Sequence, residues 1–204
     1  MKHDDSHQAY AAWARHRLDE MDAALTSLAA KSDQLKLEAK AEATRLAAEM
    51  AKWRADFEAE AKAQMKAAED ALEASKTHLE QQRATFEDHL KTYVETVGKD
   101  IDQKRSTFDG LAAAQAKAWR EGAEKLQSAA TQLGADNQAK AEKALAHVRS
   151  QAAEWEAQMT KLGADANASW SSLSETLEAS RKTFDEASHT AWDAIKSALA
   201  PKKG

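Results

Sequence analysis

The chain contains no cysteine, a single proline and only six glycines among its 204 residues. Without cysteine it has neither a disulfide framework nor a thiolate nucleophile or metal ligand. The one proline, Pro201, lies three residues from the end, so no proline breaks a helix in the preceding 200 residues. No apolar run approaches the roughly 20 residues that a membrane-spanning helix requires.

Signals for targeting and for nucleic-acid binding are also missing. The first ten residues, MKHDDSHQAY, are charged and lack the apolar stretch of a secretory signal. The formal net charge is −5, and the only basic block is the terminal PKKG, whereas nucleic-acid phosphates demand a basic face. We therefore expect a cytoplasmic protein without a transmembrane segment that binds no nucleic acid.

The composition that remains is typical of long helices. Charged residues make up 31% of the chain and apolar residues 43%, but alanine supplies much of the apolar class, so large side chains are sparse. Chains rich in Ala, Glu, Lys, Leu and Arg with helical periodicity form coiled coils and long helices. No alternating strand pattern occurs, and we expect α-helix over nearly all of residues 5–199.

Large apolar residues recur at a fixed interval along the chain. After heptad spacing over residues 18–35, one column at an 11-residue interval consists of Phe86, Val97, Phe108 and Trp119. Two further columns are Leu162, Leu173, Phe184 and Ile195, and Val148, Met159, Trp170 and Trp192, the last with Arg181 as its exception. Eleven residues fill three turns at about 3.67 residues per turn, so the columns form one stripe along a straight helix.

Folding the chain so that paired residue numbers sum to 205 brings this stripe against itself. Trp13 then lies opposite Trp192 and Phe86 opposite Trp119, while Gly98 can end one helix and Ser106 can cap the next. The sequence thus predicts an all-α fold, a long antiparallel coiled-coil helical hairpin with hendecad and heptad repeats. Residues 1–204 would form a single elongated domain, with one helix over about 5–97, a turn over about 98–106 and a second helix over about 107–199.

The helix-pairing seam of this hairpin is expected to contain the large side chains of the stripe. They are Trp13, Met21, Leu28, Leu35, Leu46, Trp53, Phe57, Leu72, Leu79, Phe86, Val97, Phe108, Trp119, Leu126, Leu133, Val148, Trp155, Met159, Trp170, Leu177, Phe184, Trp192 and Ile195. One hairpin leaves half of each stripe exposed, and such patches usually find a partner. We therefore expect a homodimer or higher self-association, with two hairpins forming a four-helix assembly.

Two other arrangements remain open. An antiparallel dimer of continuous helices satisfies the same pairing between chains, and Ile101 keeps the 11-residue phase through the expected turn. A shorter multi-helix bundle is favoured by QLGADNQ at 132–138 and KLGADANAS at 161–169, where Gly134 and Gly163 are typical of helix ends. Because the stripe keeps its phase across both stretches, we expect kinks or tolerated glycines there.

No constellation of residues points to catalysis. The seven histidines, His3, His7, His16, His78, His89, His147 and His189, are scattered along the chain, and we expect none of them to belong to a helical zinc site. His3, behind a free amino terminus, offers a weak square-planar copper or nickel site of the kind any chain with histidine at position 3 has. We expect a non-enzyme with no catalytic residues, no cofactor and no other metal site.

Two stretches carry a resemblance to known classes, ALEASKTHLEQQRATFEDHLKTYVETV at 71–97 and TLEASRKTFDEASHTAWDAIKSALA at 176–200. They resemble the 11-residue amphipathic repeats of apolipoprotein-like helices and of late-embryogenesis-abundant (LEA) desiccation proteins. The alanine-rich, acidic, cysteine-free composition is also similar to that of phasins, which coat bacterial polyester granules. The six tryptophans depart from the desiccation class, and the missing internal prolines depart from animal apolipoproteins.

The leading functional hypothesis is an elongated, non-catalytic coiled-coil protein with a structural, scaffolding or protein-interaction role. The alternative, which the resemblance implies, is an amphipathic coat on a lipid, droplet or polyester-granule surface. There the stripe would open from helix pairing and bury its Trp, Phe and Leu side chains in the apolar phase. A stress-protective chain that is disordered in water is disfavoured by the aromatic content.

Overall fold

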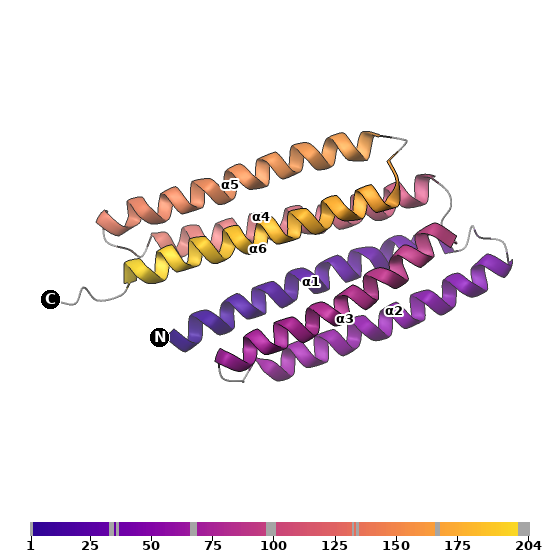
Figure 1. Ribbon diagram of the computed structural model, residues 1–204, viewed down its shortest axis with the longest axis horizontal. Helices are drawn as coiled ribbons and strands as arrows, with labels where there is room; N and C mark the ends of the chain where they lie inside the picture. The colour runs from indigo at the N-terminus through magenta and orange to yellow at the C-terminus, as the bar shows by residue number, and fades with distance from the viewer. Residues whose placement is uncertain are drawn as a thin grey trace. The chain divides into compact units, whose positions relative to one another are not determined.

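A computed structural model describes residues 2–32, 35, 37–65, 69–96, 101–131, 133, 135–165 and 168–199. Within these residues the chain is helical and has no strand (Figure 1), which confirms the expected all-α class. The helices are α1 Lys2–Ser32, α2 Leu37–Gln64, α3 Glu69–Thr96, α4 Ile101–Ala130, α5 Ala135–Ala164 and α6 Trp170–Leu199.

Short helices thus stand where the sequence predicts two long ones. Each helix has 28 to 31 residues, or about 42–47 Å at 1.5 Å per residue. In a single long hairpin, each stripe would face only one neighbouring helix. Reversing the chain every 30 residues or so lets a stripe meet several helices of the same chain, which removes its large side chains more completely from water.

Several expected boundaries differ from those of the structure. Residues 101–106 of the expected turn are the first residues of α4, whereas residues 97–100, with the seam residue Val97, lie outside the described part. The expectation of continuous helix at the two glycine stretches is wrong, since α4 ends at Ala130 and α5 ends at Ala164, directly after Gly163. Gly134 itself is outside the described residues, and α1 begins at Lys2 rather than near residue 5.

The chain divides into two compact units, where the sequence analysis expects one domain. Unit 1 is Met1–Ala114 and unit 2 is Gln115–Gly204, so the boundary falls inside the continuous helix α4. The first half of α4 therefore belongs to the core of unit 1 and its second half to the core of unit 2.

In unit 1, α1 packs on both α2 and α3, and α2 packs along α3. α1 and α3 run parallel, because the hydroxyl of Tyr10 bonds to that of Ser75 at 2.8 Å and Arg17 pairs with Glu80 further along both helices. The first half of α4 joins α1 through the hydroxyl of Thr107, which lies 2.9 Å from that of Ser27.

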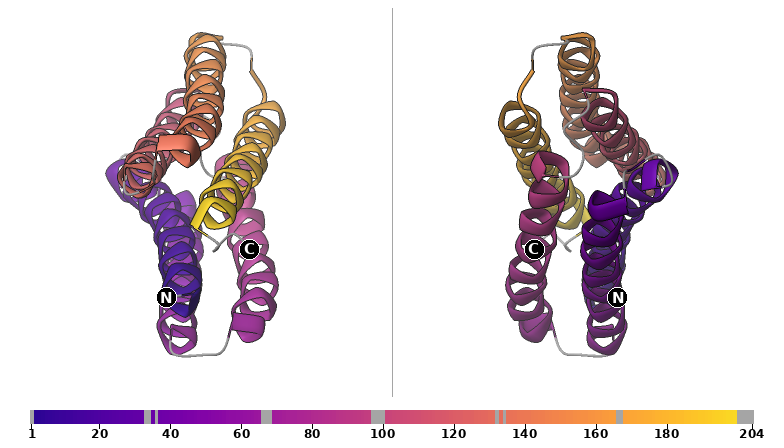
Figure 2. Two further views of the ribbon diagram at one scale, coloured as in Figure 1. Left: turned by 90° about the vertical axis from the view of Figure 1, so that its left-hand side faces the viewer. Right: turned by 90° about the vertical axis from the view of Figure 1, so that its right-hand side faces the viewer.

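In unit 2, α5 packs along α6, as Figures 1 and 2 show. The second half of α4 lies against α6, with the ring of Trp119 edge-on to that of Phe184 at a centroid distance of 4.9 Å. The side-chain amide of Gln115 also donates a hydrogen bond to the Leu177 carbonyl at 3.0 Å. Both units therefore contain a parallel contact between helices that are separated by one antiparallel helix in the chain.

Most of the expected seam residues lie in the cores of the units. Trp13, Leu35, Trp53 and Trp192 are half-buried, Val97 is outside the described part, and the other eighteen of the 23 are buried. Trp13, which the sum-205 register places opposite Trp192, packs its ring against Phe57 of α2 at 6.0 Å.

Met65 is the single large apolar side chain that is exposed among the described residues. The apolar stripe is thus largely covered within the described part of the chain and does not itself call for a partner, so the homodimer stays a prediction.

Candidate functional site

The described residues offer little for metal or substrate chemistry. They contain no group of three or more His, Cys, Asp or Glu side chains that could hold a metal ion, and the side chain of His3 is outside them. None of the helices in this part of the chain is both long enough and apolar enough to cross a bilayer. The absence of catalysis and of cofactors stays a prediction from the sequence.

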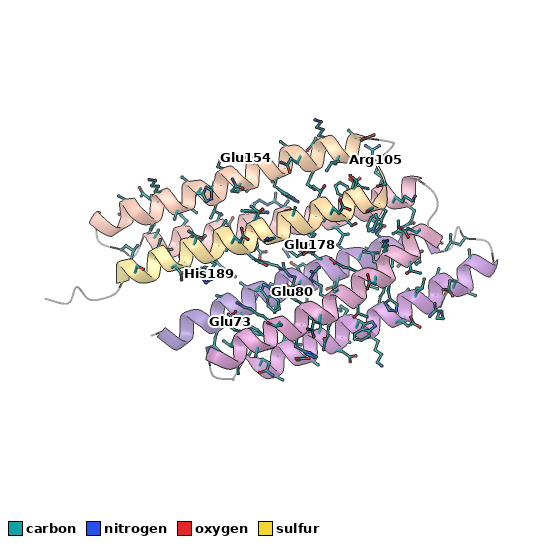
Figure 3. The ribbon with its side chains drawn as sticks, in the orientation of Figure 1. Glu73, Glu80, Arg105, Glu154, Glu178 and His189 are labelled. Carbon is teal, nitrogen blue, oxygen red and sulfur yellow. The ribbon has the colours of Figure 1, made fainter. Side chains whose placement is uncertain are left out.

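The outer faces of the helices carry solvated charges. Arg45 of α2, for example, pairs with Glu42 and Glu49 at 2.6 Å, and all three side chains are well exposed. Figure 3 places Glu154 on α5 and His189 on α6, both of them exposed. Pairs of this kind contribute about 0–1 kcal/mol each, so they keep the surface hydrated and define no site.

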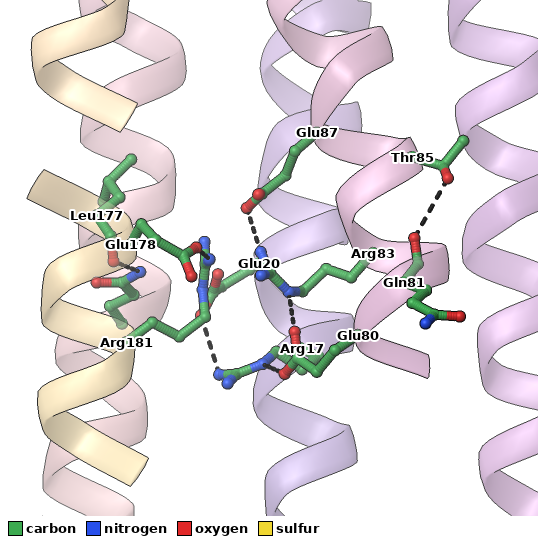
Figure 4. Close-up of polar contacts among 11 residues, drawn as sticks. Arg17, Glu20, Glu80, Gln81, Arg83, Thr85, Glu87, Leu177, Glu178 and Arg181 are labelled. Carbon is green, nitrogen blue, oxygen red and sulfur yellow. Dashed lines mark hydrogen bonds and ion pairs between the residues drawn. The ribbon is translucent and has the colours of Figure 1, made fainter. Parts of the chain in front are cut away.

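A cluster of charged side chains joins α1 to α3 inside unit 1 (Figure 4). Arg17, Glu20 and Arg83 are each at most 7% exposed. The Nε atom of Arg17 lies 2.8 Å from a carboxylate oxygen of Glu80, and Arg83 bonds to both Glu80 and Glu87. A carboxylate of α3 is thus shared between an arginine of its own helix and one of α1, which fixes the register of the two helices.

The electrostatics of this cluster follow from burial and from the two guanidinium groups. Burial raises the pKa of Glu80, but Arg17 and Arg83 outweigh it and hold the pKa at about 2. Glu80 is therefore ionised at neutral pH. Burying such groups costs solvation free energy that the pairing only partly restores. The cluster therefore contributes more to the alignment of α1 with α3 than to the stability of unit 1.

A second polar group lies between α1 and α4 in unit 1. Ser27, Gln103 and Thr107 are all buried, and the Gln103 amide donates to the Thr107 hydroxyl at 3.2 Å and to the Ser27 carbonyl at 3.3 Å. Every member of this group has a hydrogen-bond partner, as buried polar groups in native proteins usually do.

Unit 2 differs from unit 1 at a tetrapeptide that both contain. The sequence Leu-Glu-Ala-Ser occurs at 72–75 in α3 and at 177–180 in α6, and both leucines and both serines are buried. The Ser75 hydroxyl bonds to Tyr10 of α1. The Ser180 hydroxyl has no hydrogen-bond partner among the described residues.

Further unsatisfied polar atoms lie around α6. The buried Oε1 of Gln115, Nε1 of Trp119 and Oγ of Ser188 also lack hydrogen-bond partners within the described part of the chain. Gln115 and Trp119 are the α4 side chains that touch α6 at Leu177 and at Phe184. Each unsatisfied buried group costs about 1–3 kcal/mol, so the contact between α4 and α6 is made at a polar cost.

The six tryptophans divide into two groups. Trp119, Trp155 and Trp170 are buried in unit 2, whereas Trp13, Trp53 and Trp192 are half-buried. The half-buried indoles belong to α1, α2 and α6 and keep one edge near water, an arrangement that amphipathic aromatic side chains favour at interfaces.

Sequence reasoning found the apolar stripe but missed the polar groups within it. The signal that could have found one of them is Arg181, which interrupts the column of Val148, Met159, Trp170 and Trp192 and is 5% exposed. Ser27, Gln103 and Gln115 gave no such signal, because polar residues beside a stripe are ordinarily read as solvent-facing. Comparison of the chain with protein families, with characterised proteins and with solved structures finds no match.

Proposed function

We propose that the protein is a non-catalytic coat of uncharged apolar surfaces, closed as helical bundles in water and opened on the surface. The observation that carries the proposal is the mixed character of its buried residues. Each helix turns its apolar stripe inward, yet in the described part of the chain eleven polar or charged side chains are buried beside these stripes, three of them arginines. Such a core closes with less gain than an apolar one.

Opening on an apolar surface would return the buried polar and charged groups to water and would keep the apolar side chains buried. A helix that lies on an apolar surface inserts its Trp, Phe and Leu side chains there. Long side chains at the edge of the stripe, such as Arg17 and Arg83, can extend their charged ends into water. The two states therefore bury the same stripe and differ in how well the polar groups are solvated, which is the condition for a reversible coat.

A second candidate is the scaffold or spacer that the sequence analysis favours. The observation in its favour is that the continuous helix α4 contributes residues to both units. The two candidates differ in their response to an apolar surface, which a spacer has no reason to bind.

The test is flotation of the full chain with triolein droplets coated with phosphatidylcholine. We expect the protein to float with the droplets and to keep its helical circular dichroism while its tryptophan emission shifts to the blue. An opened helix of 30 residues, about 45 Å long and about 10 Å wide, covers about 450 Å², so a fully opened chain covers about 2,700 Å² at saturation. A chain that stays in solution would rule out the coat and leave the spacer.

A disulfide lock makes the test specific for opening. The Ser27 and Thr107 hydroxyl groups are hydrogen-bonded at 2.9 Å, so cysteines at these positions would bring their sulfur atoms close together, and the wild-type chain has no cysteine. The oxidised S27C/T107C variant should cover less area per molecule than the wild type, because α1 and the first half of α4 cannot separate, and reduction should restore the wild-type area. Equal areas in the two redox states would contradict opening of unit 1.

A further inference from the structure

Helix α6 has the composition of a surface-inserting helix. It carries seven large apolar residues, namely Trp170, Leu173, Leu177, Phe184, Trp192, Ile195 and Leu199, against five in α2. Its remaining positions include nine Ser or Thr residues and eight charged ones, whereas α2 has one Thr and eleven charged residues. A larger apolar face opposite a less charged face favours binding through insertion over binding through charge.

Several polar atoms where α6 packs in unit 2 have no hydrogen-bond partner in the described part of the chain. Its own Ser180 and Ser188, and the Gln115 and Trp119 side chains of α4 that touch it, each contain a buried polar atom without a partner in the described residues. In unit 1, the corresponding Ser75 of α3 is hydrogen-bonded to Tyr10. Moving α6 away from α4 would return the unsatisfied atoms of Gln115 and Trp119 to water.

The packing of Phe184 against α4 also favours release of α6. The ring of Phe184 lies over Gly122 of α4, where an added Cβ would meet the ring at 3.0 Å. The ring therefore rests on bare backbone and on the edge of Trp119, with no side chain at position 122 to enclose it.

From these observations we infer that α6 is the element that leaves the bundle first and inserts into an uncharged apolar surface with exposed hydrocarbon. This inference rests on the proposed function and names the segment and the surface that begin it. Trp192, which is half-buried in the closed protein, makes the first contact. Five acidic and three basic residues give α6 a net charge of −2, so anionic lipids do not attract it.

The experiment compares two half-buried tryptophans, Trp192 of α6 and Trp53 of α2, in the full chain. Association with phosphatidylcholine-coated triolein droplets is followed in a stopped-flow instrument by energy transfer from tryptophan to a dansyl lipid, which both variants support because each keeps five tryptophans. W192E should lower the association rate constant at least tenfold, and W53E less than twofold. Equal slowing, no slowing or greater slowing by W53E would overturn the inference while leaving the coat intact.

Failure of the proposed function would give a different result from failure of this inference, because the wild-type chain would then not associate with the droplets at all. Helical circular dichroism and a cooperative melt establish that each variant is folded. If W192E fails this check, two variants that keep only Trp192 or only Trp53, with phenylalanine at the other positions, replace it. Brominated lipid should then quench Trp192 before Trp53, and the reverse order overturns the inference.

A second measurement tests the preference for an uncharged surface. Replacing a third of the phosphatidylcholine by phosphatidylserine should change the wild-type rate constant by less than twofold at about 0.15 M salt, where charge is screened over about 8 Å. A tenfold increase would show that anionic headgroups are the target and would overturn the stated selectivity.

Discussion

The repeated Leu-Glu-Ala-Ser tetrapeptide allows one substitution to be made in two environments that differ in hydrogen bonding. Ser75 and Ser180 are 6% and 5% exposed. Each of them lies three residues after a leucine of the same helix that is 2% exposed. The Ser75 hydroxyl lies 2.8 Å from that of Tyr10, whereas the Ser180 hydroxyl has no partner in the described part of the chain. We predict that Ser→Ala has opposite signs at the two positions.

The magnitudes follow from the buried groups. S75A leaves the hydroxyl of Tyr10, which is 1% exposed, without its partner, at a cost of about 1–3 kcal/mol. Alanine's higher helix propensity returns about 0.5 kcal/mol, so the net loss is about 1–2 kcal/mol. S180A removes an unsatisfied hydroxyl and gains the same propensity, so unit 2 should become more stable by about 1–2 kcal/mol.

The assay is urea unfolding followed by circular dichroism and by tryptophan emission. With a slope of about 2 kcal/mol/M, the midpoint should fall by about 0.5–1 M in S75A and rise by a similar amount in S180A. S174A, at a half-buried serine whose hydroxyl bonds to the Ser171 carbonyl within α6, is the control and should move the midpoint by less than 0.3 M, that is, by about 0.5 kcal/mol or less. Shifts of the same sign in S75A and S180A would refute the reasoning from hydrogen-bond satisfaction.

Three further predictions concern α4, the charged cluster and the redox lock. In α4, G110A should stabilise unit 1 by about 0.5–1 kcal/mol through helix propensity, since its Cβ would meet the Ala23 carbonyl at an ordinary 3.6 Å. G122A should stabilise the protein less, or destabilise it, because its Cβ would lie 3.0 Å from the Phe184 ring. Thermal melts in which G122A is more stable than G110A would contradict this packing. For Glu80, a fall in pKa from 4.5 to about 2 corresponds to about 3 kcal/mol, which exposure of about a third of the side chain reduces to about 1–2 kcal/mol. Because this pKa is lowered by folding, the contribution is present above about pH 4.5 and is lost as the pH falls toward 2; E80Q should lack it at pH 7 and show a flatter stability profile over that range, with E42Q, at an exposed surface pair, as the control. Oxidised S27C/T107C should be more stable than its reduced form by up to about 4.5 kcal/mol, the entropy of closing a loop of about 80 residues, and a melting temperature that does not depend on oxidation would show that the two sulfur atoms do not meet.

The sequence predicted the helical class and the identity of the core but not where the chain reverses. Stripe membership depends on side-chain spacing alone, which is why residues such as Phe57, Leu79 and Val148 are fully buried as expected. The stretches at 132–138 and 161–169 carried glycine signals; α4 ends at Ala130, just before the first stretch, and α5 ends at Ala164, inside the second. Between α2 and α3 the sequence is MKAA, which consists of good helix formers, so tertiary packing rather than local propensity sets that reversal.

The candidate site was less predictable for a related reason. Pattern analysis assigns polar residues to the solvent face, and it has no means of distinguishing Ser75, which bonds to Tyr10 from 65 residues away, from Ser180 in the same tetrapeptide. The difference depends on which residue of the neighbouring helix faces each serine. Only the fold supplies that residue.

The 11-residue repeat explains why one long hairpin and several short helices look alike in the sequence. Successive helices begin 32 to 35 residues apart, close to three repeats of 11, so each helix and its following turn together use about three repeats. A column that leaves one helix therefore re-enters the next with nearly the same phase, and Ile101 keeps the phase although it begins a new helix. A fold register shifted by whole repeats preserves the apolar pairing and changes only which polar residues meet. Polar groups such as Ser27, Thr107 and the Arg17–Glu80 pair thus select one arrangement among several that the apolar stripe alone would accept, and the same near-equivalence is what would let the stripe exchange a neighbouring helix for an apolar surface.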